Sequence, residues 1–184
     1  MMKQLQQKKW IKLIQKKSDE NAANELIAHY YPSIYAYVYK QTLNKELSMD
    51  LTQEIFISML QSIHHYDDKK ASFKTWLYRI ATYKVVDYFR SRHYTYAQST
   101  DYLEFDEVAA SSDFTIELEY KEDLQRVIDL LNAFHVKDQQ ILRLKLFAEQ
   151  TFSEIAVTLD IPESSIKTKY YSAIRKIKQR MEAE

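Results

Sequence analysis

Positive charge is concentrated near the end of the chain. Residues 164–180 hold six lysines and arginines and no carboxylate, although the whole chain holds 26 basic and 26 acidic residues. Basic side chains that neutralise phosphates release condensed counterions and so bind nucleic acid. Carboxylates in the same segment would be repelled by those phosphates. The pattern therefore favours a nucleic-acid-binding surface.

A helical projection of this segment separates two faces. The face expected to lie on the core is apolar or aromatic and comprises Ile166, Tyr170, Ala173, Ile174, Ile177 and Met181. The opposite face has a polar centre line of Ser164, Thr168, Tyr171 and Arg175, flanked by Lys167 and Lys178 on one side and by Lys169 and Lys176 on the other. This arrangement fits a helix seated in a DNA groove between two phosphate backbones. An ordinary solvated basic helix is the alternative.

The residues just before this segment predict a helix–turn–helix. Thr151 and Glu154 have the spacing of a capping box that begins a helix. The helix has one apolar stripe, made of Phe152, Ile155, Ala156 and Leu159. Asp160 tolerates the left-handed backbone of the turn, and Pro162 suits the first turn of the next helix.

Residues 49–63 predict a two-sided helix in the first half of the chain. Its expected core face is Leu51, Ile55, Phe56, Met59, Leu60 and Ile63. The other face is polar and comprises Gln53, Glu54, Ser58 and Gln61, with Asp50 at its margin and Ile57 among them. Periodicity allows Ile57 to be either a protein contact or a harmless surface residue.

Residues 73–92 predict a further helix, which is rich in aromatic and basic residues. Phe73, Trp76, Leu77, Ile80 and Ala81 form its expected core face. The remaining aromatic and basic residues are Tyr78, Arg79, Tyr83, Tyr88, Phe89, Arg90 and Arg92. Bases of single-stranded nucleic acid stack on such rings, each contributing roughly 1–3 kcal/mol. A tyrosine-rich core helix with snorkelling arginines is the alternative.

Charge divides the chain into parts. Residues 69–92 carry seven bases and one acid, and residues 101–123 carry nine acids and one base. This asymmetry indicates partners more clearly than the neutral total does. We predict two small helical domains, at 1–95 and 116–184, joined by an acidic flexible linker at 96–115.

Composition predicts an all-α fold. Glycine is absent and only two prolines are present. Tight hairpins between strands depend on glycine, so a chain without it must turn through residues such as Asn44 and Asp160. Residues 1–17 form a basic amphipathic pattern, which we interpret as a docked first helix; a membrane-surface role is the alternative.

Other function classes lack their sequence features. No run reaches the roughly 18 apolar residues that a membrane span requires, and the start lacks a secretory signal. The absence of cysteine suits a reducing cytoplasm. The five histidines show no metal-ligand or catalytic-triad spacing, and no glycine loop could cradle phosphate. We therefore predict a cytoplasmic protein that is not an enzyme and holds no metal or cofactor.

Four segments, in this order, resemble bacterial RNA polymerase sigma factors of the extracytoplasmic-function group. Residues 25–40 (ELIAHYYPSIYAYVYK) resemble the start of region 2, and residues 50–56 (DLTQEIF) resemble its D-x-x-Q-E-x-F signature. Residues 73–92 resemble the W-L-x-R-I-A … D-x-x-R segment, and residues 138–179 resemble region 4. The resemblance covers almost the whole chain and implies a promoter-specificity subunit that opens DNA without ATP hydrolysis.

The resemblance implies roles for three groups of residues. The group that docks the polymerase β′ clamp helices is Asp50, Gln53, Glu54 and Phe56. The clamp helices would then be the partner of the exposed stripe that includes Ile57. The group that melts the −10 element is Tyr66, Lys69, Lys70, Ser72, Lys74, Trp76, Arg79, Tyr83 and Arg90. The group that contacts the −35 element is Ser164, Ser165, Lys167, Thr168, Tyr171 and Arg175. The implied partners are core RNA polymerase, including its β flap, promoter DNA and an anti-sigma factor.

Two positions depart from the family pattern, because Tyr83 stands where the family commonly has Asn and Asp160 where it usually has Gly. At Tyr83, stacking would replace hydrogen bonding in the −10 contact. Two other functions fit the residues alone. One is a stand-alone helix–turn–helix regulator that dimerises through its N-terminal domain, and the other is a helical adaptor whose basic faces bind acidic proteins.

Overall fold

The computed structural model describes residues 2–96 and 114–182, with side chains described for 5–91 and 123–182. No strand is present in these ranges, which confirms the predicted all-α class. The elements are α1 (Met2–Lys17), α2 (Glu20–Thr42), α3 (Lys45–Ser62), the 3₁₀ helix η1 (Ile63–His65), α4 (Phe73–Tyr96), α5 (Phe114–Asn132), α6 (Val136–Leu146), α7 (Phe152–Leu159) and α8 (Glu163–Glu182). Most of the predicted linker, 97–113, lies outside the described residues.

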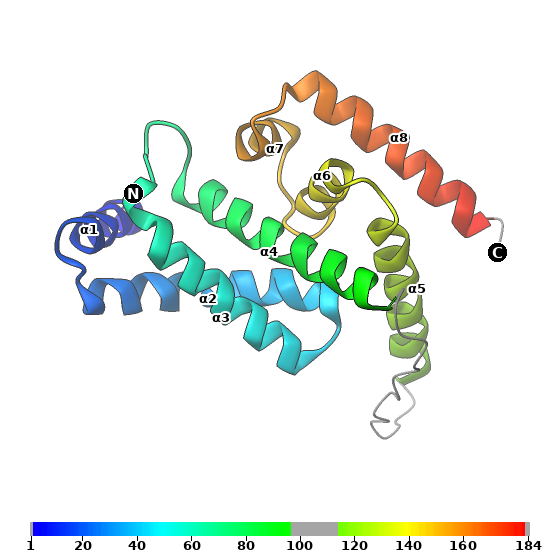
Figure 1. Ribbon diagram of the computed structural model, residues 1–184, viewed down its shortest axis with the longest axis horizontal. Helices are drawn as coiled ribbons and strands as arrows, with labels where there is room; N and C mark the ends of the chain where they lie inside the picture. The colour runs from blue at the N-terminus through cyan, green and yellow to red at the C-terminus, as the bar shows by residue number, and fades with distance from the viewer. Residues whose placement is uncertain (1, 97–113, 183–184) are drawn as a thin grey trace.

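Two sets of helices meet along α4 (Figure 1). Each of the helices α1, α2 and α3 packs against the next helix in the chain, and η1 contacts both α1 and α3. Helices α6, α7 and α8 pack against one another, and α5 contacts α6. Helix α4 also contacts α6 and α7, so it lies between the two sets. The buried residues of both sets belong to one continuous hydrophobic cluster.

The first helix is docked on this core. Ile11 and Ile14 of α1 are buried against the neighbouring elements, whereas Leu5 is 67% exposed. Gln15 adds polar contacts, since its Nε2 donates to the backbone oxygens of Ile63 and Tyr66 at 2.8 and 3.0 Å. The predicted docking of this segment is therefore confirmed. Among the helices described, none combines the length and the apolar character that crossing a membrane demands.

The turns show how a chain without glycine reverses direction. Asp160 adopts the predicted left-handed backbone, with φ 56° and ψ 50°. The prediction for Asn44 is wrong, because Asn44 is extended and caps α3 by accepting from the Leu47 N–H at 2.9 Å. An N-cap needs this extended backbone for its side chain to reach the third helical amide. The left-handed step therefore falls on the preceding residue, Leu43, with φ 50°.

The helix–turn–helix is built largely as its sequence predicts. The Thr151 side chain accepts from the Glu154 N–H at 3.2 Å, and Glu154 accepts from the Thr151 N–H at 2.8 Å. These two bonds confirm the capping box that begins α7. Ile166, Ala173 and Ile177 of α8 are buried as expected. Met181 is exposed instead, since α8 continues one turn beyond Ile177, its last buried residue.

Hydrogen bonding of Glu154 to the Thr151 backbone lowers the pKa of that carboxyl. We expect Thr151→Ala to lower the free energy of unfolding by about 1 kcal/mol. The Glu154 N–H would lose its acceptor, the Thr151 hydroxyl. The Glu154 carboxylate, which accepts from the Thr151 N–H, would lose the hydroxyl that also orients it. Urea denaturation followed by circular dichroism measures this. Ser153→Ala, an exposed change in the same first turn, is the control. Equal stability of the two variants would contradict the role of the cap.

Candidate nucleic-acid and protein interfaces

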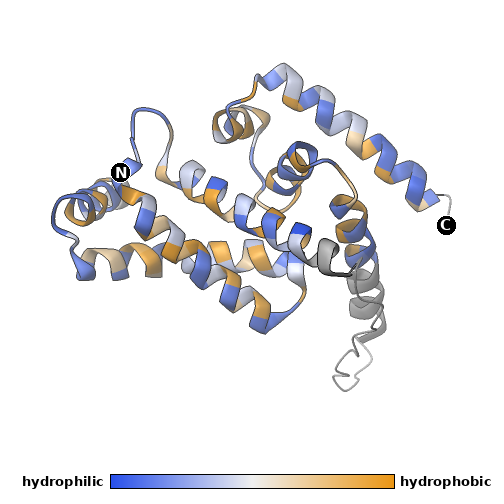
Figure 2. Cartoon of the chain, viewed as in Figure 1, coloured by the Kyte–Doolittle hydropathy of each residue, from blue (hydrophilic) through white to orange (hydrophobic). Residues whose placement is uncertain are grey.

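The outer face of α8 presents the polar line predicted from the sequence. Ser164, Thr168, Tyr171 and Arg175 are all exposed, with Tyr171 58% exposed. The Thr168 hydroxyl donates to the Ser164 backbone oxygen at 3.0 Å, which orients it along the helix. Hydrophilic residues predominate along this helix in Figure 2. The line is therefore free to meet a ligand along its whole length.

The cations beside this line differ in whether they are exposed and whether they form an ion pair. Lys167 is exposed but forms an ion pair with Glu163 at 2.7 Å, and this hydrogen bond raises the pKa of Lys167. Lys169 is half-buried and bonds Asp138 of α6 at 3.0 Å, so it ties α8 to α6 and is not a free rim cation. Lys176 and Lys178 are exposed. The sequence projection could not foresee the α6 carboxylate.

An aromatic cluster fixes α8 relative to α7. The ring of Phe152 contacts Tyr170 edge-on at 5.3 Å and lies 5.9 Å from Tyr171. The ammonium of Lys145 lies 4.9 Å from the centre of the Phe152 ring, a cation–π distance. The ring of Phe152 therefore supports the exposed ring of Tyr171 from beneath and limits the rotamers that Tyr171 can adopt.

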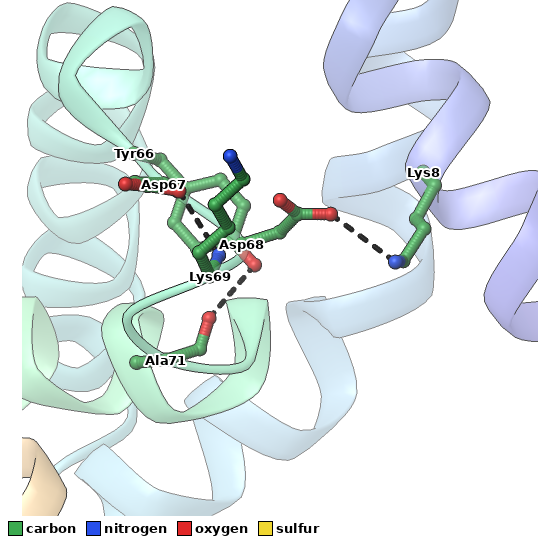
Figure 3. A network of polar contacts seen from close by, with 6 residues as sticks. All are labelled: Lys8, Tyr66, Asp67, Asp68, Lys69 and Ala71. Carbon is green, nitrogen blue, oxygen red and sulfur yellow. Dashed lines mark hydrogen bonds and ion pairs between the residues drawn. The ribbon is translucent and has the colours of Figure 1, made fainter.

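A second candidate surface surrounds the loop between η1 and α4. Figure 3 shows Lys8 extending from α1 toward Asp68, with an Nζ–Oδ2 distance of 3.1 Å. Within the loop, Asp67 accepts from the Lys69 N–H at 2.9 Å, and the Tyr66 hydroxyl donates to the Ala71 backbone oxygen at 3.1 Å. Helix α1 and these internal bonds together hold the loop in one shape.

Aromatic rings underlie this loop. Tyr66 contacts Phe73 at 5.4 Å and Trp76 at 5.2 Å, and Phe73 also contacts Tyr30 at 5.3 Å. Phe73 is buried, whereas Tyr66 and Trp76 are half-buried. Burial raises the pKa of Tyr66 to about 12, with the nearby carboxylate of Asp68 acting in the same direction. The Tyr66 phenol therefore stays neutral and able to donate its hydrogen bond at physiological pH.

A cavity of about 650 Å³ opens between α1 and the loop. Its walls combine rings, amides, cations and carboxylates, and its lining includes Gln7, Lys8, Lys12, Tyr30, Tyr66, Asp67, Asp68, Phe73 and Lys74. The volume lies within the range of small-molecule sites. The half-buried ring of Tyr66, which could stack on a planar group, thus shares one cavity with lysines and with two carboxylates. The contribution of α1 to it was not predicted from the sequence.

The other predicted residues of the loop and α4 divide into exposed and structural ones. Lys69, Lys70, Lys74, Arg79 and Arg90 are exposed. Arg79 lies 5.9 Å from the ring of Tyr83, which is 40% exposed. Arg90 forms an ion pair with Asp87 at 3.8 Å. The Ser72 hydroxyl accepts from the Thr75 N–H at 3.1 Å, so it caps the start of α4.

One aromatic residue of α4 departs from the nucleic-acid interpretation. Tyr78 is buried, contacting Tyr37 edge-on at 5.3 Å. For this ring the alternative stated from the sequence, a tyrosine-rich core helix, is the one that the structure supports. Helix α4 is covered from a second side by α6 and α7, so it has room for more core residues than one face provides.

Helix α3 presents a separate, acidic stripe. Asp50, Gln53 and Glu54 are exposed, and Ile57 is 54% exposed. Glu54 forms an ion pair with Lys84 of α4 at 3.4 Å. Phe56 lies on the opposite side, where its buried ring stacks on Tyr31 at 6.1 Å. Phe56 therefore supports the stripe from the core and does not line it.

Arg143 of α6 is a feature that the sequence did not single out. Its side chain is 0% exposed, and its Nη1 donates to Oε1 of Gln41 in α2 at 2.7 Å. The available signal was a pair of charged residues, Arg143 and Lys145, within an apolar run (QQILRLKLF). In the part of the chain that the structure describes, no cluster of histidine, aspartate or glutamate could hold a metal ion.

Comparison with known sequences adds family evidence. Residues 26–94 match the family Sigma-70 region 2. The chain is 28% identical over 179 residues to the ECF RNA polymerase sigma factor SigW of Bacillus subtilis (strain 168), covering 92% of this chain and 95% of SigW. It is 24% identical over 156 residues to SigX of the same organism, covering 83% of this chain and 80% of SigX.

Solved structures show the same fold at low sequence identity. CnrH, in complex with the cytosolic domain of CnrY, is 15% identical with a TM-score of 0.65, and the match covers 97% of this chain and 99% of CnrH. The sigma factor RpoE in complex with the anti-sigma factor NepR, from Bartonella quintana, is 15% identical with a TM-score of 0.56, covering 88% and 97% of the two chains. At this identity the likeness supports the fold alone.

Buried phenols predict the response of the fold to alkali. Burial raises the pKa of both Tyr30 and Tyr66 to about 12, from an ordinary value near 10. Between about pH 10 and pH 12 the unfolded chain releases protons that the folded chain keeps, so the free energy of unfolding should fall as pH rises.

We expect the double variant Tyr30→Phe and Tyr66→Phe to lose part of this pH dependence of the free energy of unfolding, since phenylalanine has no titratable hydroxyl. Urea denaturation at a series of pH values from 8 to about 12 measures the slope. An unchanged slope in the double variant would show that these phenols do not set it.

Proposed function

Because the chain belongs to the extracytoplasmic-function group of RNA polymerase sigma factors, we propose that it binds core RNA polymerase and directs it to particular promoters. The observation that carries the proposal is the exposed polar line on α8, with exposed lysines beside it and an aromatic support beneath it. A helix of this kind suits the DNA major groove, where side chains can read base edges. The protein would act in the cytoplasm, where promoter DNA and polymerase are available.

In the proposed function, α8 contacts the −35 element. Ser164, Thr168, Tyr171 and Arg175 would face base edges, because they form the centre of the exposed face. Lys176 and Lys178 would contact the phosphates on either side. Lys167 would exchange its exposed ion pair with Glu163 for a phosphate at little cost, since solvent and salt screen such surface pairs. Ser165 is half-buried and would assist from the edge of the face.

The loop and α4 would engage the −10 element. Unpairing and unstacking a base costs a few kcal/mol, which a fitted cavity can offset. The cavity between α1 and the loop offers the half-buried ring of Tyr66 for stacking and Lys74 for a phosphate. Tyr83 and Arg79 together would extend this surface along α4 by stacking and charge. Stacking by Tyr83 replaces the hydrogen bonding expected of the usual family residue.

The acidic stripe on α3 would dock the β′ clamp helices of the polymerase. Ile57 would be the apolar anchor at its centre. Its side chain is 54% exposed among polar residues, and covering it on binding removes apolar surface from water, which favours the complex. The β flap is a further proposed contact. Bartonella quintana RpoE, a structural neighbour, was solved with the anti-sigma factor NepR, which supports including an anti-sigma factor among the proposed partners.

Run-off transcription with purified core polymerase on a genomic library tests the function and identifies the promoter. We expect transcripts that require the chain and start at a defined distance from a shared sequence. A chain that fails to join the core polymerase would contradict the proposal. Tight, specific DNA binding by the free chain, with no effect on the polymerase, would support a stand-alone regulator.

We expect Gln53→Ala combined with Glu54→Ala to weaken core binding by roughly tenfold or more, as truncation of central interface residues does. Stability should change little, because the Glu54–Lys84 pair lies on the surface. Fluorescence-detected titration with core polymerase measures the affinity. Glu46→Ala, an exposed change at the start of the same helix, is the matched control. Unchanged affinity of the double variant would remove this stripe from the interface.

We expect Arg175→Ala to reduce discrimination between the −35 element and altered sequences by about 1–3 kcal/mol, the range for a good base contact. Lys178→Ala, on the flank of the same helix, should weaken binding to every sequence alike and lower the salt slope by about 1. Competition binding at several salt concentrations separates the two behaviours. A uniform loss in Arg175→Ala would reassign that residue to a phosphate contact.

A further inference from the structure

One glutamine side chain joins helix α1 to both ends of η1. Nε2 of Gln15 donates to the backbone oxygen of Ile63 at 2.8 Å and to that of Tyr66 at 3.0 Å. Ile63 begins η1 and Tyr66 is its C-cap, so the two oxygens belong to the two ends of one 3₁₀ turn. Backbone oxygens at the end of a helix lack partners within that helix. This pair of bonds, the Gln15 brace, thus holds the last turn before the loop of residues 66–72.

The conformation of this loop depends on the position of its first two residues. The Tyr66 N–H donates to the Ile63 oxygen at 3.1 Å, and the Tyr66 hydroxyl donates across the loop to the Ala71 oxygen at 3.1 Å (Figure 3). The Asp67 backbone oxygen accepts from the Lys70 N–H at 3.1 Å. Bonds that begin at residues 66 and 67 therefore reach the far end of the loop. A displacement of the backbone at Tyr66 would disturb all of them.

The same backbone position determines where the Tyr66 ring lies. The centre of this ring is 5.2 Å from that of Trp76 and 5.4 Å from that of buried Phe73, both at the start of α4. The ring is half-buried and lines the cavity between α1 and the loop, as Gln15 itself does. Ordering a mobile side chain when a ligand binds costs conformational entropy. A ring that is already fixed therefore stacks on a base more favourably than a mobile one.

A second tie between α1 and the loop is weaker than the Gln15 brace. Nζ of Lys8 lies 3.1 Å from Oδ2 of Asp68, and these side chains are 60% and 48% exposed. Solvent and salt screen exposed ion pairs of this kind. Gln15 is half-buried instead, and its acceptors are uncharged backbone oxygens. The brace is therefore the tie whose loss should affect the loop most.

We propose that Gln15 is a positioning residue for the opening of the −10 element. By holding the backbone of Ile63 and Tyr66, it presents the Tyr66 ring in one place to a base that has left the duplex. The inference rests on the proposed function, in which the loop captures unpaired bases of this element. Capture of an extruded base offsets the free energy of unpairing. A loop that is ordered before it binds captures the base more tightly, so Gln15 acts through the loop backbone.

Two substitutions of similar size remove the donors of the brace. Gln15→Glu replaces the amide nitrogen by an oxygen that would face two backbone oxygens, and Gln15→Met removes the donors without adding a charge. Gln6→Glu makes the first change at an exposed position of α1 and is the matched control. Circular dichroism checks folding, and Gln15→Met decides alone if Gln15→Glu does not fold.

Hydrogen exchange on the free chain, followed by mass spectrometry, tests the brace without using its function. We expect the amides of residues 63–72 to exchange about tenfold faster in Gln15→Met, because the loss of two hydrogen bonds makes local opening more frequent. Peptides from α8 of the same variant should exchange as they do in the parent. Gln6→Glu should match the parent throughout. Unchanged exchange of residues 63–72 in a folded Gln15→Met chain would overturn the proposal.

Binding of single-stranded DNA to core polymerase loaded with the chain tests the role in opening. The probe is a fluorescent oligonucleotide with one strand of the −10 element that run-off transcription identifies. We expect Gln15→Met to weaken this binding about tenfold, the factor that corresponds to the two lost hydrogen bonds. Its affinities for core polymerase and for a −35 duplex should not change, whereas a loss of fold would lower all three. Unchanged affinity for the oligonucleotide would overturn the role in opening.

A promoter that is already unpaired separates positioning from other defects. On duplex promoter DNA we expect Gln15→Met to start fewer transcripts than the parent. On a template with mismatches across the −10 element the difference should largely disappear, because opening is then favourable even with weaker capture. An equal defect on both templates would overturn the role in opening. A parent chain that starts no transcripts on either template would instead contradict the proposed function, and hydrogen exchange would then decide the Gln15 brace by itself.

Discussion

The burial of α4 on two sides is the constraint on which the rest of the structure depends. Its apolar residues Phe73, Leu77, Ala81 and Val85 are buried, spaced so that they follow one face of the helix. Tyr78, Thr82 and Val86 widen this face, and both α3 and α6 contact the helix. Among the side chains of α4 that the structure describes, the exposed ones after Lys74 lie along one strip that includes Arg79 and Tyr83. Any ligand of α4 must therefore approach along this strip or from the loop before it.

Local sequence patterns predicted the elements because they depend on neighbours along the chain. The capping box at Thr151 and the left-handed turn at Asp160 are set by residues within one helical turn, and both were predicted. The burial of Arg143 was not predicted, and for Tyr78 the sequence left a core and a surface position open, since both depend on helices distant in sequence. Asn44 was assigned the wrong conformation because asparagine suits both a turn and an N-cap. The choice between them depended on where α3 begins.

The same limit applies to the candidate interfaces. Periodicity predicted which side of α8 is exposed, because one apolar stripe defines the other face. It did not predict that Lys169 is bonded to Asp138, or that α1 lines the cavity beside Tyr66. Each of those contacts joins elements that only the fold brings together. The pattern within a helix thus predicts which of its side chains are exposed. Which residues of other helices contact those side chains can be seen only in the three-dimensional structure.

The absence of glycine places the turns and helix ends of this chain under the control of side chains. Leu43 and Asp160 take left-handed backbone steps, while Asn44 and Thr151 cap the starts of α3 and α7. Capped helices with fixed turns make rigid units, and rigid units hold recognition side chains more accurately than loops do. The candidate surfaces of α3 and α8 therefore lie on helices that begin at capped or tightly turned positions, because no glycine is present to loosen the turns before them.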